Sequence, residues 1–405
     1  MASPDKKEII GQGPMKIGLF LNARPTDGGA FQYSRSILEA VASLPKTHFA
    51  PLTVYTNKDW VGPVSEQDIP ALYSSPGLWG LLARKRISGY LPLTWWRRWC
   101  PSFQPMIKTL NNQSCDLWIF PSQDTWTYLF PFPSIGTIYD LMHRYERHFP
   151  EVGSRGIYKS REQHYKRICL FAKKIFADSA VGKRHIIESY GISPEKIHIL
   201  PFAASRQTTA DTGIISSYKL PEKFIFYPAQ FWKHKNHKAL IDALHLLRHT
   251  LPDLKLVFVG SKKNNYINLS KHIMQLDLSD HVRFLGYIPD EAMPVLYNRA
   301  RAFIMPTFFG PTNIPPLEAM AEGCPVAVSD IYGMREQLRD AALYFNPSSI
   351  SGIAKAIHAL WTDDGLCHEL SQRGKQHHIQ WNQHHFNNRL RVIIETFTHE
   401  DNQRT

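Results

Sequence analysis

The sequence predicts an α/β protein of two domains, each built on a parallel sheet covered by helices on both faces. Two series of short apolar runs alternate with segments whose apolar residues recur at helical spacing, which is the pattern of strands that alternate with helices. The chain has 405 residues, whereas single domains usually run to roughly 100 to 200 residues. Between the two series, residues 205–220 are rich in Ser, Thr, Ala and Gly, as a linker would be.

The first series begins with the strand-forming run Lys16 to Asn22, followed by a Gly28-Gly29 turn and a helical pattern. Its helices are expected at 31–41 and 160–171, and its further strands at 50–55, 117–120, 134–139 and 174–178. The second series predicts strands at 224–228, 255–260, 282–286, 302–305 and 325–329, with helices near 236–247 and 290–298. Parallel sheets place ligands at the carboxyl ends of their strands, so polar residues that follow a strand are the candidates for a site.

These series set the expected domain limits. We expect an N-terminal domain over 1–204, the linker over 205–220 and a C-terminal domain over 221–385. A last helix is expected over 386–405, and it could pack back towards the N-terminal domain.

The charge and the cysteines narrow the class of protein. A net charge of +12 favours an anionic partner, which could be a nucleic acid, an acidic membrane surface or a phosphorylated small molecule. The five cysteines are scattered without a CxxC pair, so neither a disulfide framework nor a zinc site is supported. No signal sequence and no apolar run of about 20 residues occurs. We therefore expect a cytoplasmic protein.

The stretch from Phe309 to Pro325, FGPTNIPPLEAMAEGCP, carries the strongest chemical signal. It follows a predicted strand and leads into a helix that should begin near Pro315, because proline is favoured at a first helical position. The amides of Thr312, Asn313 and Ile314 would then lie exposed at the positive end of the helix dipole. Such a position suits an anion, and a diphosphate would fit.

This stretch resembles the donor-binding signature of the retaining glycosyltransferase family 4, whose GT-B fold has two Rossmann-like domains facing a central cleft. The family's usual form is Glu, seven residues, Glu, a helix of small residues and then Gly-x-Pro-Val. Glu318 matches the second glutamate, which the resemblance implies contacts the nucleotide ribose. Gly310 stands at the first glutamate, so this chain carries the variant GPTNIPPLEA and lacks the sugar-contacting side chain there.

The segment Tyr227 to Asn236, YPAQFWKHKN, is the second anchor of the resemblance. Members of the family usually carry an Arg and a Lys five residues apart here, and they neutralise the donor diphosphate. Lys235 matches the lysine, and Gln230 stands at the arginine position. The resemblance thus implies a donor site formed by Gln230, Lys235, Gly310, Thr312, Asn313, Ile314 and Glu318, with Lys235 also catalytic. Taken alone, such a lysine would be ordinary solvated surface.

Two features of the N-terminal half are similar to the family's looser motifs. Gly28 and Gly29 resemble the glycine loop at which the backbone approaches the substrates, and a plain tight turn is the alternative. Asp140 and His143 follow a predicted strand and resemble the family's Asp-x-x-His. The resemblance implies a catalytic role for both, binding sugar hydroxyls or polarising the acceptor. The alternative is a structural histidine in a loop.

Basic residues and tryptophans are interleaved from Trp79 to Lys108. No acidic residue occurs between Asp68 and Asp116, whereas this segment holds four tryptophans, Trp79, Trp95, Trp96 and Trp99, among Arg84, Lys85, Arg86, Arg97, Arg98 and Lys108. Such a segment suits the interface of an anionic membrane, which would place the protein on the inner face of the membrane. A polyanion, or ordinary surface with core tryptophans, explains it as well.

The resemblance covers residues 15 to 381 and implies one activity. We expect a retaining hexosyltransferase that moves a mannose- or rhamnose-type sugar from a nucleotide diphosphate sugar to a glycan or lipid-linked acceptor of a bacterial surface polysaccharide or lipopolysaccharide. No Asp-x-Asp motif occurs, so we expect no metal, no cofactor beyond this co-substrate and no specific nucleic acid. The alternatives are a nucleotide-sugar epimerase of the same fold and a basic membrane- or polyanion-binding protein on a degenerate transferase scaffold.

Overall fold

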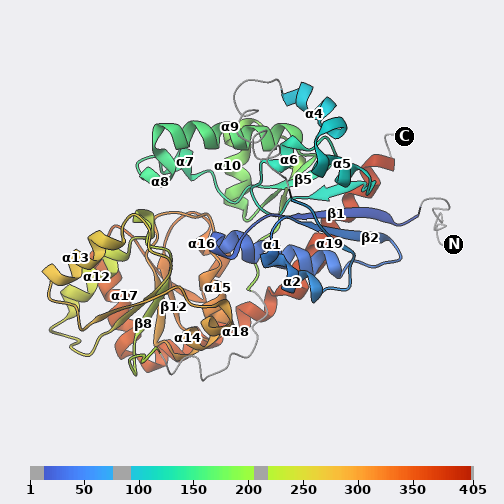
Figure 1. Ribbon diagram of the computed structural model, residues 1–405. Helices are drawn as coiled ribbons and strands as arrows, with labels where there is room; N and C mark the ends of the chain where they lie inside the picture. Colours follow the sequence, from blue (N-terminus) through green and yellow to red (C-terminus); the bar gives the residue numbers. More distant parts are fainter. Residues whose placement is uncertain (1–12, 76–92, 205–217, 403–405) are drawn as a thin grey trace. The chain divides into compact units, whose positions relative to one another are not determined.

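The computed structural model describes residues 13–75, 93–204 and 218–402 (Figure 1). The chain forms two compact units, of which the first comprises residues 1–137, 167–176 and 387–405 as far as they are described. The second unit comprises residues 138–166 and 177–386. Most of the predicted linker, residues 205–217, lies outside the described residues. The domain boundaries proposed from the sequence therefore stay a prediction.

The first sheet has seven strands in the order β3-β2-β1-β4-β5-β6-β7. Its strands are β1 (Met15–Leu21), β2 (Phe49–Tyr55), β3 (Ala71–Tyr73), β4 (Leu117–Ile119), β5 (Ser134–Thr137), β6 (Lys174–Ala177) and β7 (Ile197–Ile199). The pairings from β3 across to β6 are parallel. Gly18 of β1 is needed for this packing, because an added Cβ would lie 2.5 Å from the ring of Trp118 on β4.

Ten α-helices of the described residues lie before the second sheet or at the C-terminal end of the chain. They are α1 (Gly29–Ala42), α2 (Val61–Ser65), α4 (Leu93–Phe103), α5 (Pro105–Asn111), α6 (Trp126–Leu129), α7 (Met142–Tyr145), α8 (Pro150–Gly153), α9 (Arg155–Phe171), α10 (Ala180–Tyr190) and the chain's last helix, α19 (Gln383–Asn402). Residues of α19 from 387 onward belong to the first unit, where Lys174 Nζ lies 3.2 Å from Thr396 Oγ1.

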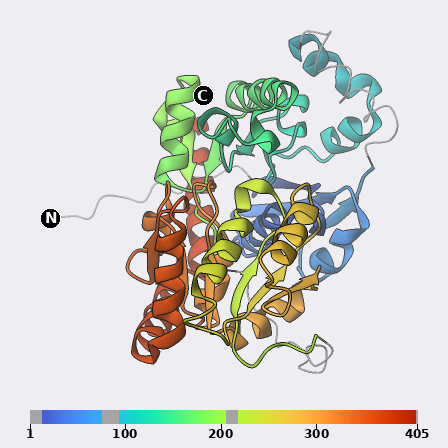
Figure 2. The ribbon, with the colours of Figure 1, turned by 90° about the vertical axis from the view of Figure 1, so that its left-hand side faces the viewer.

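The second sheet has six parallel strands in the order β10-β9-β8-β11-β12-β13. Its strands are β8 (Ile225–Pro228), β9 (Leu256–Val259), β10 (Val282–Gly286), β11 (Ala302–Met305), β12 (Val326–Ser329) and β13 (Ala342–Phe345). Its helices are α12 (His237–Leu247), α13 (Tyr266–Gln275), α14 (Met293–Arg299), α15 (Pro315–Ala321), α16 (Met334–Leu338), α17 (Ile350–Thr362) and α18 (Asp364–Gln380). Figures 1 and 2 show helices on both faces of this sheet.

The predicted fold class of two doubly wound parallel sheets is confirmed. The apolar runs predicted as strands coincide with β1, β2, β4, β5, β6 and β8 to β12 within a few residues, and α15 begins at Pro315 as expected. Strands β3, β7 and β13 lie outside the predicted runs. Among the described helices, none has both the length and the apolar composition needed to cross a bilayer.

Candidate functional site

Three loops meet at the carboxyl ends of β8, β11 and β13. The chain turns after β8 through Asn236, a residue with a positive φ of 57°. The Asn236 side-chain amide donates to the carbonyl oxygens of Pro306 (3.0 Å) and Pro347 (2.9 Å), which follow β11 and β13. The carbonyl of His234 accepts the Phe308 N–H at 2.9 Å. The segment that holds Lys235 is therefore fastened to the segment that precedes Gly310, so the structure brings the two sequence motifs together.

Lys235 lies in this junction with a half-buried side chain. The Tyr227 hydroxyl donates to its carbonyl oxygen at 3.0 Å, which fixes its backbone. Burial lowers the pKa of the Lys235 ammonium to about 8, and the nearby Asp140 carboxylate acts in the opposite direction. Within the described residues, no hydrogen bond or ion pair engages this ammonium. A desolvated cation without a direct partner is a favourable place for an anion to bind.

Gly310 begins the loop that carries the other motif. Its φ of +117° is a conformation that side chains rarely adopt, and an added Cβ would lie 3.0 Å from the Asn313 side chain. This backbone explains why a glycine stands where the related signature has a glutamate. Thr312 follows, only 7% exposed, and its hydroxyl donates to the carboxylate of Asp178.

The amide at Asn313 is not exposed, which corrects the sequence prediction for this group. Asn313 N–H donates to Gln337 Oε1 at 3.0 Å, and the Gln337 amide donates back to the Asn313 carbonyl at 2.9 Å. Thr312, Asn313 and Ile314 are all buried. Because this pair joins the loop before α15 to α16, the Asn313 amide is already satisfied and would have to exchange Gln337 for a ligand.

Glu318 lies in the first turn of α15 and is 7% exposed. The Tyr297 hydroxyl, on α14, donates to Glu318 Oε2 at 2.7 Å. Burial and the adjacent carboxylate raise the pKa of Tyr297 well above its ordinary value, so this hydroxyl keeps its proton and stays a donor. The arrangement fixes the carboxylate for which the family resemblance implies a contact with the ribose.

Gln230 follows β8 and is held locally. Its Oε1 accepts the indole N–H of Trp232 at 2.8 Å. Gly260, after β9, closes against this loop, because an added Cβ would lie 2.4 Å from the carbonyl oxygen of Ala229. Gln230 thus offers a neutral amide where the family signature has the guanidinium of an arginine.

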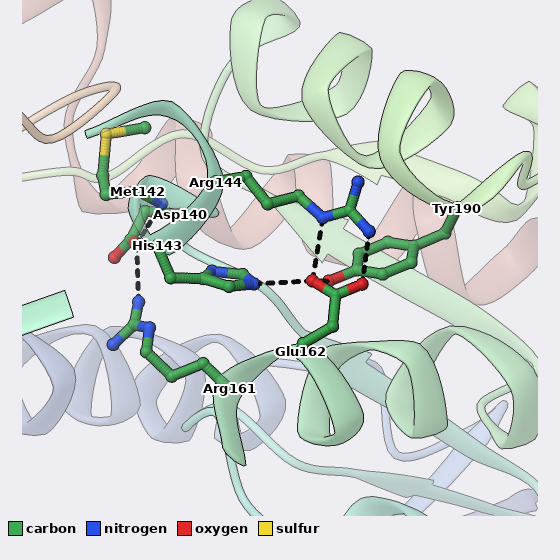
Figure 3. Close-up of polar contacts among 7 residues, drawn as sticks. All are labelled: Asp140, Met142, His143, Arg144, Arg161, Glu162 and Tyr190. Carbon is green, nitrogen blue, oxygen red and sulfur yellow. Dashed lines mark hydrogen bonds and ion pairs between the residues drawn. The ribbon is translucent and has the colours of Figure 1, made fainter. Parts of the chain in front are cut away.

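Asp140 and His143 belong to a polar network between α7, α9 and α10 (Figure 3). The Asp140 carboxylate accepts the Met142 N–H at 3.0 Å and pairs with Arg161 at 2.7 Å. It is also close enough to influence the pKa values of Lys235 and Asp178. Asp140 thus lies at the edge of the junction described above.

His143 points away from solvent. Its ring is fully buried between Tyr158 and Tyr165, and its Nε2 lies 3.0 Å from Glu162 Oε2. Arg144 also pairs with Glu162, and burial lowers the pKa of His143. Figure 3 shows both side chains converging on Glu162. This enclosure favours the structural role that the sequence left open as an alternative, and the catalytic role of His143 stays a prediction.

A second buried pair stands beside Lys235. Glu151 Oε1 accepts from the backbone N–H of His234 at 3.2 Å and lies 3.3 Å from its Nδ1. The His234 ring stacks on Phe309 with centroids 4.0 Å apart. Burial lowers the pKa of His234 to about 4, while burial of Glu151 is outweighed by the hydrogen bonds from His234, which lower the Glu151 pKa to about 2. The pair is therefore a neutral imidazole that donates to a carboxylate.

Sequence reasoning missed Asp178, Glu151 and Gln337. Asp178 ends the run predicted as a strand, so the rule of watching polar residues after strands could have found it. Burial raises the pKa of Asp178 to about 7 against the opposing hydrogen bonds from Thr312 and Ser179. Glu151 and Gln337 lie on short helices without a distinctive pattern, and no sequence signal marks them.

Gly28 and Gly29 belong to the first unit. Gly28 has a φ of +60° and precedes α1, which begins at Gly29. An added Cβ on Gly28 would meet nothing within 4 Å, so the backbone conformation and not crowding calls for glycine. Their part in binding an acceptor stays a prediction.

Residues 215–377 match the family described as Glycosyl transferases group 1. This region contains the whole second sheet with Lys235 and Glu318.

Two relatives of the chain are O-antigen chain mannosyltransferases by name. The chain is 25% identical over 280 residues to O-antigen chain mannosyltransferase B of Escherichia coli, a match that covers 63% of this chain and 72% of that protein. It is 28% identical over 185 residues to O-antigen chain mannosyltransferase RfbU of Salmonella typhimurium, covering 46% of this chain and half of RfbU.

Solved structures extend the likeness to both sheets. Sucrose-phosphate synthase from Thermosynechococcus elongatus aligns with a TM-score of 0.72 at 17% identity, covering 95% of this chain and 100% of that one. Anabaena HepE, solved in complex with UDP, aligns with a TM-score of 0.69 at 16% identity, covering 94% of this chain and 100% of that one. At such identities the likeness establishes the fold, and the predicted GT-B class is confirmed.

Proposed function

We propose that the protein is a glycosyltransferase that moves a mannose-type sugar from a nucleotide diphosphate sugar to a glycan or lipid-linked acceptor in bacterial surface polysaccharide synthesis. The named mannosyltransferase relatives support the class of sugar and of product. HepE, solved with UDP, supports a nucleotide sugar as donor. Retention of configuration and independence of metal rest on the family resemblance and on the missing Asp-x-Asp motif.

One observation carries this proposal. The Lys235 ammonium is desolvated and unengaged in the described residues, on a loop hydrogen-bonded to the GPTN segment. A diphosphate bound there would supply a directly bonded counter-charge, which the described residues do not provide. Surface lysines, by contrast, are hydrated and gain little from one more anion.

The chemistry follows from where charge develops. When the bond between sugar and diphosphate breaks, negative charge grows on the departing phosphate oxygen. Lys235 is a preorganised cation for that charge in a partly dry site, where electrostatic stabilisation is strongest. Glu318, oriented by Tyr297, holds the ribose at the other end of the donor. Asp140, whose carboxylate is near enough to raise the pKa of Lys235, would accept hydrogen bonds from the sugar or the acceptor.

The test compares two neighbouring lysines. Lys235→Ala should lower donor turnover by about 10² to 10³-fold, because removing one preorganised stabilising group typically costs ~2.7 to 4 kcal/mol in the barrier. Lys233→Ala is the matched control, since Lys233 lies on the same turn but is exposed. We would measure thermal stabilisation by a panel of nucleotide sugars, then sugar transfer to isolated glycan acceptors. Equal turnover in the wild type and Lys235→Ala would refute the assigned role.

The products separate the alternatives. A new glycosidic bond on the acceptor supports transfer, whereas a donor converted to its epimer without transfer supports an epimerase. If no nucleotide sugar stabilises the protein and a polyanion binds in a salt-sensitive way, the degenerate-scaffold alternative is correct.

A further inference from the structure

Helix α4 (Leu93–Phe103) has one face anchored in the first unit. Trp96 is 4% exposed and Cys100 is fully buried, one helical turn apart. The indole N–H of Trp96 donates to the Leu129 carbonyl at 3.1 Å. Arg97 donates to the carbonyl oxygens of Tyr128 and Phe130 and lies over the ring of Phe171. This face, which includes Arg97, therefore packs against the rest of the first unit and stabilises its fold.

The other face of α4 presents aromatic side chains to solvent. Trp95 is 50% exposed, Trp99 47% and Phe103 55%. Their spacing of four residues aligns them along one side of the helix. Single exposed apolar residues are ordinary, but three large aromatic residues in a row on one helix are not. Figures 1 and 2 both show α4 at the periphery of the first unit.

The charged residues near this aromatic row in the sequence are basic. Arg98 is exposed beside it, and its guanidinium lies 5.7 Å from the Trp99 ring centroid. Lys108, on the following helix, is exposed as well. No acidic residue occurs in the sequence between Asp68 and Asp116. Trp79, Arg84, Lys85 and Arg86 of the same basic segment lie outside the described residues.

We propose that the outer face of α4, formed by Trp95, Arg98, Trp99 and Phe103, docks on a bilayer that contains anionic lipids. Tryptophan rings reside at the headgroup level, and arginine between them pairs with lipid phosphates. A polyanion would call for more cations than this face carries. The inference is independent of the proposed sugar transfer, because it rests on a helix far in sequence from Lys235 and Glu318.

The experiment is sedimentation with vesicles of phosphatidylcholine, with and without phosphatidylglycerol. The wild type should bind the vesicles that contain phosphatidylglycerol, and Trp95→Ala with Trp99→Ala should weaken binding by about tenfold or more. Arg98→Glu should weaken it too, without touching the packed face. Nucleotide release from a donor sugar, followed without membrane, should be unchanged in these variants, which separates this test from that of the proposed function.

Two controls make the result specific. Arg299→Glu changes the net charge as Arg98→Glu does, at an exposed position of α14, and should leave binding intact. Tyr287→Ala removes an aromatic ring that is 58% exposed elsewhere. The proposal is overturned if the wild type does not bind, if the tryptophan variant binds as the wild type does, or if Arg299→Glu weakens binding as much as Arg98→Glu. Loss of heparin or protein binding by the tryptophan variant, with vesicle binding unchanged, would also overturn it.

Discussion

The Thr312 hydroxyl donates a hydrogen bond to the carboxylate of Asp178, which fastens the loop after β11 to the residue that follows β6. Both side chains are buried, with exposures of 7% and 4%. Asp178 also accepts from the Ser179 hydroxyl at 3.0 Å, and Ser179 caps α10. A buried carboxyl thus controls a loop of the candidate donor site, so its protonation should be visible in stability.

Replacing Asp178 with Asn should flatten the dependence of stability on pH. Burial raises the pKa of Asp178 from 3.8 to about 7, so the folded protein holds this proton while the unfolded chain releases it. Its contribution is favourable at low pH and is lost as pH rises through this window, by up to ~4 kcal/mol. Urea unfolding of wild type and Asp178→Asn at a series of pH values measures the difference. The exposed Asp253→Asn is the control, and parallel curves for all three proteins would contradict the assignment.

Removing the Glu151 side chain should loosen the turn that carries Lys235. Glu151→Ala leaves the His234 N–H and Nδ1–H without their acceptor in a buried setting, at a cost of ~1 to 3 kcal/mol. Glu151→Gln keeps an acceptor for His234 and should therefore lose less stability than Glu151→Ala. Thermal unfolding gives the stability and donor KM gives the effect on the turn. Equal losses in both variants would mean that the acceptor at His234 is not what matters, and the exposed Glu291→Ala serves as control.

Tyr297→Phe should raise the KM for the donor more than it lowers kcat. The change removes only the hydroxyl that holds Glu318 Oε2 at 2.7 Å, so the carboxylate loses its orientation towards the ribose. The expected loss is ~1 to 3 kcal/mol, or about five- to 150-fold in kcat/KM. Steady-state kinetics measures it, with Tyr287→Phe as a control in which the hydroxyl is on an exposed ring. An unchanged KM would argue against Glu318 as a donor ligand.

Periodicity was enough to predict the two sheets. The buried strands β8, β11 and β12 read as continuous apolar runs, as parallel strands covered on both faces do. The edge strands β3, β7 and β13 were not predicted, because each is only three or four residues long and too short for a periodic pattern to show. Pro315 marked the start of α15 because proline suits a first helical turn.

The site was only partly predictable, since its polar groups pair across long stretches of sequence. The motifs located Lys235 and Glu318, but Asn313 and Gln337 are partners that no local pattern connects. His143 became a candidate catalytic residue because it follows a predicted strand. In the structure, its ring is enclosed by Tyr158, Glu162 and Tyr165 of α9. Burial is a tertiary property, and the local sequence around His143 does not reveal it.

The rate of donor turnover should fall on the alkaline side because Lys235 loses its proton there. Burial lowers the pKa of Lys235 from 10.5 to about 8, so above that pH the free enzyme loses the cation that a diphosphate needs. kcat/KM should then decrease by about tenfold per pH unit. Lys235→Arg keeps a charge that does not titrate in this range, so it should be less active but lack this limb. A limb at the same pH in the arginine variant would assign the titration to another group, and Lys233→Arg should leave both limb and rate as in the wild type.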